Sequence, residues 1–215
     1  MTAVAHRGGD DLGTASRILD VAEALVQIRG FNGFSYADIA AQLRVTKAAL
    51  HYHYAGKADL GEALITRYAG RFAAALAAIN AGGGPALGKL GSYADLYLRV
   101  LSENRMCLCG MLAAEYQTLS QPMRDAVIKF FDDNEAWLEA VLQDGRQDGS
   151  LQFGGGARQA ARMIVSTLEG AMLVARSYGD PARFGAAAES LLAGLAAATA
   201  ASEPASSGRV HAPSA

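Results

Sequence analysis

The chain has 215 residues, a formal net charge of −2 and 51% apolar residues. The apolar content excludes wholesale disorder, and the near-neutral charge gives no indication of a nucleic-acid partner. No run of about eighteen or more apolar residues occurs, so the sequence predicts no membrane span. Aromatic residues make up only 7% and alanine is abundant. Because alanine is the best helix former and a poor strand former, this composition favours an all-α protein.

The chain begins with polar and glycine residues, and we expect residues 1–13 to form a flexible arm. This start lacks the apolar stretch of a secretory signal, so we expect the protein to stay in the cytoplasm. Apolar residues then recur at three- and four-residue steps from Ile18 to Ile28. The spacing predicts a first helix, which glycine at Gly30 ends.

Two short helices follow in quick succession. Ser35, with Asp38 three residues later, predicts the N-terminal cap of a helix over 36–43. After a tight turn, Thr46 is a suitable N-cap for a third helix to about residue 54. Three short helices with a tight turn between the last two predict a helix-turn-helix unit, a structure that presents one helix to the DNA major groove.

The rest of the chain has helical periodicity interrupted by glycine and proline. We expect helices over 58–80, 87–103, 108–119, 123–147, 157–178 and 181–200, and a disordered tail over 201–215. The predicted protein is therefore all-α with about nine helices. Residues 14–57 form the helix-turn-helix unit, and residues 58–200 form a larger helical domain.

The stretch HYH at His51–His53 resembles half of a metal site. On a helix, however, residues two apart point about 200° apart, so these histidines cannot close on one ion. The same geometry divides the helix into two faces: Lys47, Ala48, His51 and Tyr52 on one, and Ala49, Leu50, His53 and Tyr54 on the other. We expect the second face to pack in the core and predict no metal and no cofactor.

The first face has residue types suited to a DNA groove. Lys47 and His51 can donate to base edges or phosphate, Ala48 allows close approach to a thymine methyl, and Tyr52 can donate its hydroxyl to phosphate. Lys57 near a helix N-terminus, with Ser35 and Tyr36, is a candidate for phosphate contacts. The alternative is that this face is simply the solvated side of a small helical domain.

The segment GFNGFSYADIAAQLRVTKAALHYHYAGKADL, within about Ile18 to Tyr68, resembles the tetracycline-repressor (TetR) family. The matching features are Gly30-Phe31, Ser35, Ile39-Ala40, Val45-Thr46, Leu50 to Tyr54 and Lys57 to Leu60. The resemblance implies a homodimeric DNA-binding repressor that reads a palindromic operator through its N-terminal unit. It also implies that the C-terminal domain senses a small-molecule effector and forms the dimer.

Three positions differ from the family pattern. Arg44 stands in the turn where relatives usually have glycine, and a left-handed backbone there would cost roughly 1 kcal/mol. Contact between Arg44 and a DNA phosphate would compensate. Ala48 and His51 replace the usual glycine and tyrosine on the groove face, so the operator sequence cannot be inferred from relatives.

A palindrome requires two helix-turn-helix units related by a two-fold axis. The apolar faces of the last two helices are the predicted dimer interface, and the resemblance implies a four-helix bundle there. The residues assigned to it are Ile164, Leu168, Met172, Leu191, Leu192 and Leu195. The alternative is that these faces form only the core of one protomer.

The two cysteines occur in the stretch RMCLCGML. Cys107 and Cys109 are too close for an unstrained disulfide and too few for a metal site, and free cysteines are commonly buried as small apolar residues. The stretch nevertheless resembles a TetR subgroup with the motif R-x-C-L-x-G-x-L, some of whose members respond to electrophiles or oxidants. Arg105, if close to Cys107, would lower the pKa of its thiol, which makes a thiol-based sensor the alternative to a ligand-responsive repressor.

The effector site is predicted from isolated polar and aromatic residues in apolar helices. The candidates are Cys107, Met111, Tyr116, Asn134, Trp137 and Glu169. Two other classes of function stay open: a helical module that binds a protein rather than DNA, and a metal or thiol enzyme. The enzyme is disfavoured because no set of acid and base residues converges.

Overall fold

The computed structural model describes residues 7–197, with side chains from residue 13 onward. In this part of the chain the structure is all-α, with one isolated antiparallel bridge between Leu151 and Ala196. The helices are α1 (Arg7–Arg29), α2 (Tyr36–Leu43), α3 (Lys47–His53), α4 (Lys57–Ala81), α5 (Ala86–Ser102), α6 (Leu108–Ala114), the 3₁₀ helix η1 (Tyr116–Thr118), α7 (Gln121–Gln147), α8 (Ala157–Tyr178) and α9 (Pro181–Ala193).

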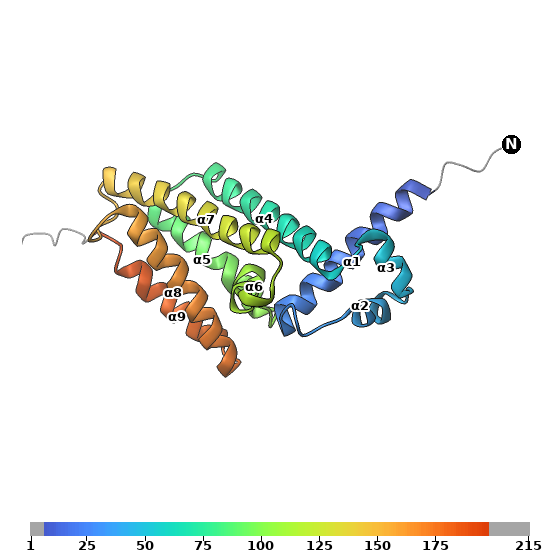
Figure 1. Ribbon diagram of the computed structural model, residues 1–215. Coiled ribbons are helices and arrows are strands. Elements are labelled where there is room, and N and C mark those ends of the chain that lie inside the picture. The colour runs from blue at the N-terminus through green and yellow to red at the C-terminus, as the bar shows by residue number, and fades with distance from the viewer. Residues whose placement is uncertain (1–6, 198–215) are drawn as a thin grey trace, which may run out of the picture.

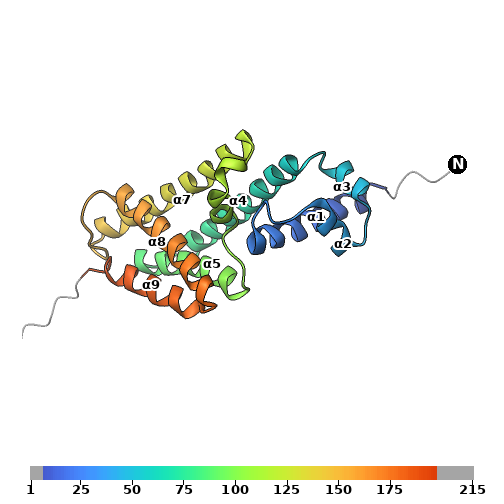
Figure 2. The ribbon, with the colours of Figure 1, turned by 60° about the horizontal axis from the view of Figure 1, so that its bottom comes forward.

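The helices form two connected units. Helices α1, α2 and α3 gather at one end of the molecule, and α5 to α9 form a larger bundle at the other (Figure 1). Helix α4 begins beside the small unit and runs into the bundle next to α7 (Figure 1; Figure 2 gives a second view). None of the helices in residues 7–197 is long and apolar enough to cross a bilayer.

The two units meet where α4 packs closely on its neighbours. A Cβ atom at Gly61 would lie 2.5 Å from the Met123 Cε and 3.1 Å from the Phe31 ring, so glycine is needed at this contact. On the other side of α4, Arg67 pairs with Asp20 at 2.7 Å and with Glu23 at 2.9 Å on α1. The position of the small unit relative to the bundle is therefore determined by direct contacts along α1 and α4.

Three helix boundaries differ from the predicted ones. Helix α1 begins at Arg7, inside the segment predicted to be an arm, because polar residues can extend an existing helix at little cost. The helix predicted over 108–119 is split into α6 and η1. Helix α9 ends at Ala193, since Leu195 turns into the core and residues 195–197 hydrogen-bond to the backbone near Ser150. The predicted tail over 201–215 lies outside the described residues.

Candidate nucleic-acid interface and effector core

The turn between α2 and α3 contains a left-handed residue. Arg44 has φ 56° and ψ 43°, as its place in a glycine position of the family pattern led us to expect. Before the turn, the Asp38 carboxylate accepts hydrogen bonds from the Ser35 backbone N–H and hydroxyl, each at 2.7 Å. This bonding lowers the pKa of Asp38. The predicted cap of α2 is thus present, and the turn fixes the start of α3.

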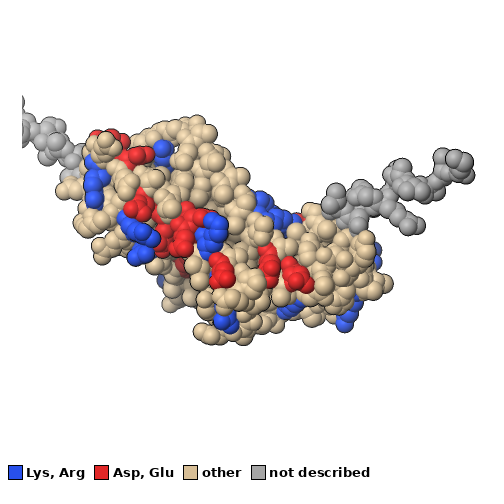
Figure 3. Space-filling model, turned by 45° about the horizontal axis from the view of Figure 1, so that its top comes forward, with Lys and Arg blue, Asp and Glu red and all other residues tan. Residues whose placement is uncertain are grey.

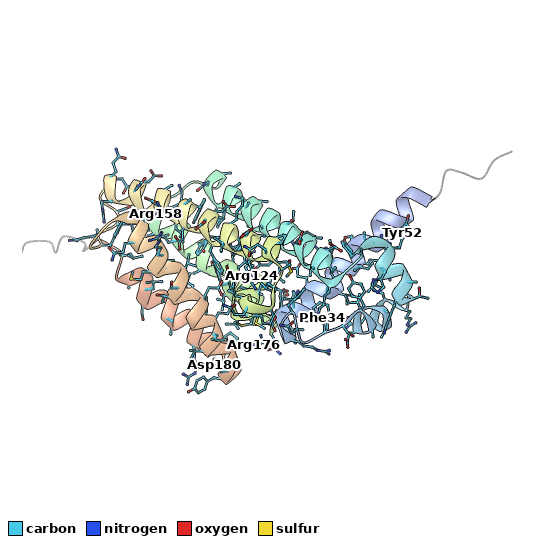
Figure 4. The ribbon with its side chains drawn as sticks, in the orientation of Figure 1. Phe34, Tyr52, Arg124, Arg158, Arg176 and Asp180 are labelled. Atoms are coloured by element: carbon cyan, nitrogen blue, oxygen red, sulfur yellow. The ribbon has the colours of Figure 1, made fainter. Side chains whose placement is uncertain are left out.

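Helix α3 has the two faces that the sequence predicted. Thr46 Oγ1 accepts the Ala49 N–H at 3.2 Å as the N-cap. Lys47, Ala48, His51 and Tyr52 are exposed, Tyr52 by 76%, whereas Leu50 is fully buried and His53 and Tyr54 are half-buried. Figure 4 labels Tyr52 in the small unit, far from the bundle. The exposed face is therefore accessible to a partner along the length of the helix.

The His51 ring has a defined orientation. Its Nδ1 lies 3.0 Å from the Ala55 carbonyl oxygen, and the ring packs on Tyr36 with centroids 4.7 Å apart. Because a carbonyl oxygen only accepts hydrogen bonds, Nδ1 carries the proton in this contact. In the neutral ring Nε2 is then an acceptor.

Two predicted phosphate ligands have other roles in this structure. The Tyr36 hydroxyl donates to the Gly56 carbonyl at 2.7 Å and lies 3.0 Å from the Tyr54 carbonyl, and burial raises its pKa to about 12. The Lys57 ammonium donates to the Phe34 carbonyl and lies 4.2 Å from the Phe34 ring centroid. Burial lowers the pKa of Lys57. Both side chains join α2, α3 and α4 together, which corrects the prediction that their polar heads point to DNA.

A carboxylate of the larger unit holds the loop between α1 and α2. Glu115, between α6 and η1, accepts the Phe31 N–H at 2.6 Å and the Asn32 N–H at 3.2 Å. The Asn32 side chain also donates to Thr118 Oγ1 at 2.7 Å. Gly30, with φ 84°, allows this approach, because a Cβ there would lie 2.7 Å from Glu115 Oε1. Sequence analysis did not identify Glu115, since no local pattern indicates a contact across more than eighty residues.

An arginine of α8 makes a second connection. Arg176 donates to the Gln27 carbonyl at 3.1 Å and to the Ile28 carbonyl, at the C-terminal end of α1. A cation is favourable there, because the last carbonyls of a helix carry partial negative charge. Figure 4 labels Arg176 near the place where the bundle meets α1. Helices α6 and α8 are thus both bonded to the element that carries the helix-turn-helix.

The cysteines lie in the interior of the bundle. Cys107 Sγ accepts the Gly110 N–H at 3.4 Å as the N-cap of α6 and the Tyr68 hydroxyl at 3.7 Å. Burial, with a smaller contribution from Glu169, raises the thiol pKa of Cys107 well above its usual range. Arg105 instead pairs with Glu103 and donates to Gln27 Oε1. The predicted activation of Cys107 by Arg105 is therefore wrong.

The candidate effector residues are only partly brought together. Asn134 is buried, and its Oδ1 accepts the Tyr93 hydroxyl at 3.1 Å. Trp137 stacks on the same Tyr93 ring, with centroids 5.7 Å apart, and Glu169 contributes to the raised pKa of that tyrosine. Met111 contacts the Arg176 guanidinium, and Tyr116 packs under Arg124 on η1. Four of the six candidates thus share the interior, and the other two belong to the connection between the units.

Comparison with known proteins identifies the chain. The family described as "Bacterial regulatory proteins, tetR family" matches residues 18–64, and "Tetracyclin repressor-like, C-terminal domain" matches residues 86–191. A TetR-family regulator from Agrobacterium tumefaciens is 32% identical, with a TM-score of 0.84 over 87% of this chain and 100% of that one. A TetR regulator from Legionella pneumophila is 34% identical, with a TM-score of 0.76 over 85% and 97%. The chain belongs to the TetR family.

A curated TetR-family relative is also similar along most of its length. The Escherichia coli transcriptional repressor NemR is 27% identical over 167 residues, which cover 76% of this chain and 84% of NemR. The structure of NemR in its reduced form superposes with a TM-score of 0.76. Helices α1 to α4 correspond to the family's DNA-binding unit and α5 to α9 to its C-terminal domain. The protein is a TetR-family DNA-binding transcriptional regulator and not an enzyme.

The apolar surface of this TetR-family protein differs from the predicted dimer residues. Ile164, Leu168, Met172 and Leu195 are buried in the core of the single protomer, and Leu191 and Leu192 are half-buried. The opposite face of α8 is apolar and exposed at Met163, Leu173, Val174 and Tyr178, with Leu173 exposed by 59% and Tyr178 by 65%. Helical periodicity identified the face of α8 with the most regular apolar pattern, which is the intramolecular one.

Charge is unevenly distributed on the surface. In the view of Figure 3, the densest group of acidic side chains lies over the larger unit, away from α1 to α3. A polyanion is repelled where acidic groups are concentrated. The distribution is consistent with DNA approaching the small unit.

Proposed function

We propose that this protein is a homodimeric repressor that a small-molecule ligand releases from a palindromic operator. The observation that supports it best is the exposed face of α3, where Lys47, Ala48, His51 and Tyr52 have no role in the core. Lys47 and His51 would read base edges, with Ala48 close to the groove floor and Tyr52 on a phosphate. Ser35, Arg44 and Thr46, all exposed next to the N-termini of α2 and α3, would contact the backbone. Such a protein acts in the cytoplasm, where its operator lies.

The orientation of His51 suggests which bases it reads. With the proton on Nδ1 directed to Ala55, the neutral ring offers Nε2 as an acceptor. In the major groove the matching donors are the amino groups of adenine and cytosine. This chain would then differ from relatives that carry a tyrosine hydroxyl at the same place.

The dimer would form through α8 and α9. The exposed apolar side chains of α8 are the natural centre of an interface with a second copy, since large exposed apolar patches indicate association. A two-fold axis there would place two copies of α3 about 34–36 Å apart, as a palindrome requires.

Release would use the two connections between the units. An effector in the bundle shifts the equilibrium only through its different affinity for two conformations. Movement of α6 or α8 would be transmitted through Glu115 and Arg176, because both bond to the end of α1 or the loop after it. The spacing between the two copies of α3 would then no longer fit the operator.

The thiol-sensor alternative has less support. The similarity to NemR, whose solved structure is described as a reduced form, favours it. The burial of Cys107 and its raised thiol pKa disfavour it, because the thiolate is the reactive form. An electrophile such as diamide should therefore leave DNA binding unchanged, and release that depends on Cys107 in a Cys107→Ser comparison would reverse this preference.

The experiment is a fluorescence-anisotropy titration of the full chain with duplex DNA from upstream of its own gene. The wild type should bind this DNA more tightly than shuffled DNA, with an affinity that falls as salt rises. The double substitution Lys47→Ala with His51→Ala should remove the preference and leave the oligomeric state unchanged. Lys129→Ala, on the exposed face of α7, is the matched control. Retained sequence preference in the double variant would refute the assignment of α3.

A further inference from the structure

The bundle contains a carboxylate that lacks a cationic partner. Glu169 extends from the flank of α8, and its Oε1 is buried without a hydrogen-bond partner. The other oxygen, Oε2, lies against Gly110 of α6, where a Cβ atom would collide with it. None of the ion pairs found among residues 13–197 includes Glu169. An unpaired buried carboxylate is costly, so its retention in an otherwise apolar helix requires an explanation.

The groups that face Glu169 from the other helices are neutral. They are Tyr68 of α4, Tyr93 and Tyr97 of α5, and Cys107 and Cys109 at α6. Burial raises the pKa of each of these groups, and the charge on Glu169 raises it further. Burial also raises the pKa of Glu169 to about 7, with partial compensation from its contact with Cys107. Within this core, Glu169 is the group that can become charged near neutral pH.

Aromatic rings occupy the same interior. Phe72 lies at their centre, with ring centroids 6.0 Å from Tyr93, 5.9 Å from Tyr97 and 5.2 Å from Phe130. Trp137 stacks on Tyr93 at an interplanar angle of 19°, and its buried Nε1 has no acceptor. The neighbouring polar atoms are satisfied, since Asn134 bonds both to Tyr93 and to the Phe130 carbonyl. The two unpartnered polar atoms of this core are therefore an acceptor on Glu169 and a donor on Trp137.

We propose that the effector core binds an organic cation with an aromatic body. Its cationic nitrogen would bond to Glu169 Oε1, and its ring would pack among the aromatic side chains, whose faces attract positive charge. The Trp137 N–H would donate to an acceptor atom on the ligand. This inference rests on the proposed function as a ligand-responsive repressor and specifies the chemical class of the effector. When the acid is protonated beforehand, binding of the cation releases one proton to the solvent.

The only tryptophan of the chain provides the assay, because Trp137 fluorescence reports on this core. The probes are benzamidinium and benzamide, which have nearly the same shape and differ in charge. At pH 8, the full-length protein should bind benzamidinium at least about ten-fold more tightly than benzamide. Glu169→Gln keeps the shape of the side chain and should abolish this preference, whereas the exposed acid Glu139 lies elsewhere on α7, and Glu139→Gln should retain it. Equal affinity for both probes, or a preference that survives Glu169→Gln, would overturn the inference.

A second measurement does not depend on any variant. For the wild type, benzamidinium affinity should increase from pH 6 to pH 8 as Glu169 loses its proton, while benzamide affinity stays constant. A flat profile for benzamidinium would also overturn the inference. Operator binding is measured on the same preparation. Intact operator binding without cation binding contradicts this inference alone, and cation binding without any operator binding supports it while contradicting the proposed function.

Discussion

Replacement of Arg44 by glycine should have opposite effects on stability and on DNA binding. Arg44 has φ 56° and ψ 43°, a conformation that costs a residue with a side chain roughly 1–2 kcal/mol. Glycine removes this cost but gives the unfolded chain more freedom, which returns about 0.4–1 kcal/mol. The Arg44→Gly variant should therefore be more stable by about 1 kcal/mol, or about 2–4 °C in Tm for a chain of this size.

The same change should weaken operator binding. If Arg44 contacts one phosphate per protomer, its loss lowers the dependence of log affinity on log salt by about 0.9 for each contact. Stability is measured by urea unfolding, and affinity by anisotropy at several salt concentrations. Asn104→Gly is the control, because Asn104 also has φ 56° but lies in the larger unit between α5 and α6. It should give a smaller gain in stability, since asparagine tolerates this conformation, and unchanged DNA binding. A destabilised Arg44→Gly variant with full operator affinity would refute the reasoning.

Three further outcomes test the core and its connections. Arg176→Met removes the bonds to the end of α1 and should destabilise the protein by about 1.5–3 kcal/mol, whereas Arg162→Met, which breaks an exposed pair on the same helix, should cost less than about 1 kcal/mol in urea unfolding. Gly110→Ala should cost about 1–3 kcal/mol, because the added Cβ collides with the Glu169 carboxyl, and its cost should shrink when combined with Glu169→Ala; strict additivity of the two would contradict the contact. The pKa of Glu169 is raised from 4.5 to about 7, so the stability of the wild type should fall as pH rises through this range; Glu169→Gln should be more stable by roughly 3 kcal/mol at pH 8 and equal near pH 4.5. A wild type and variant with parallel pH profiles would show that the carboxyl is not buried in solution.

The helix-turn-helix was predictable because its signals are local. The cap formed by Ser35 and Asp38, the cap at Thr46 and the left-handed Arg44 depend on residues within four positions of one another. The division of α3 into two faces follows from helical geometry alone, and the exposure of His51 and Tyr52 agrees with it.

Contacts between distant segments were not predictable from such patterns. Lys57 is a reasonable phosphate ligand by sequence, but the aromatic faces of Phe31 and Phe34 bind its ammonium instead. Glu115 has no local signal at all, because its partners are backbone amides of a loop far away in sequence.

The apolar faces of α8 show a second limit. Periodicity finds the apolar stripe but does not say whether it packs within one protomer or against another. Leu168 and Met172 belong to the intramolecular core, whereas Leu173 and Val174, their neighbours in sequence, are exposed. Only the packing of α8 against α7 and α9 distinguishes the two faces.

The central claim is that two copies of α3 read a palindromic DNA site. The most direct measurement is selection of bound sequences by the full-length protein from a random duplex pool, followed by determination of the stoichiometry on the enriched duplex. The account predicts an inverted repeat with half-sites about one helical turn apart and two protomers on each duplex. Absence of enrichment, or enrichment of a single asymmetric site bound by one protomer, would contradict it.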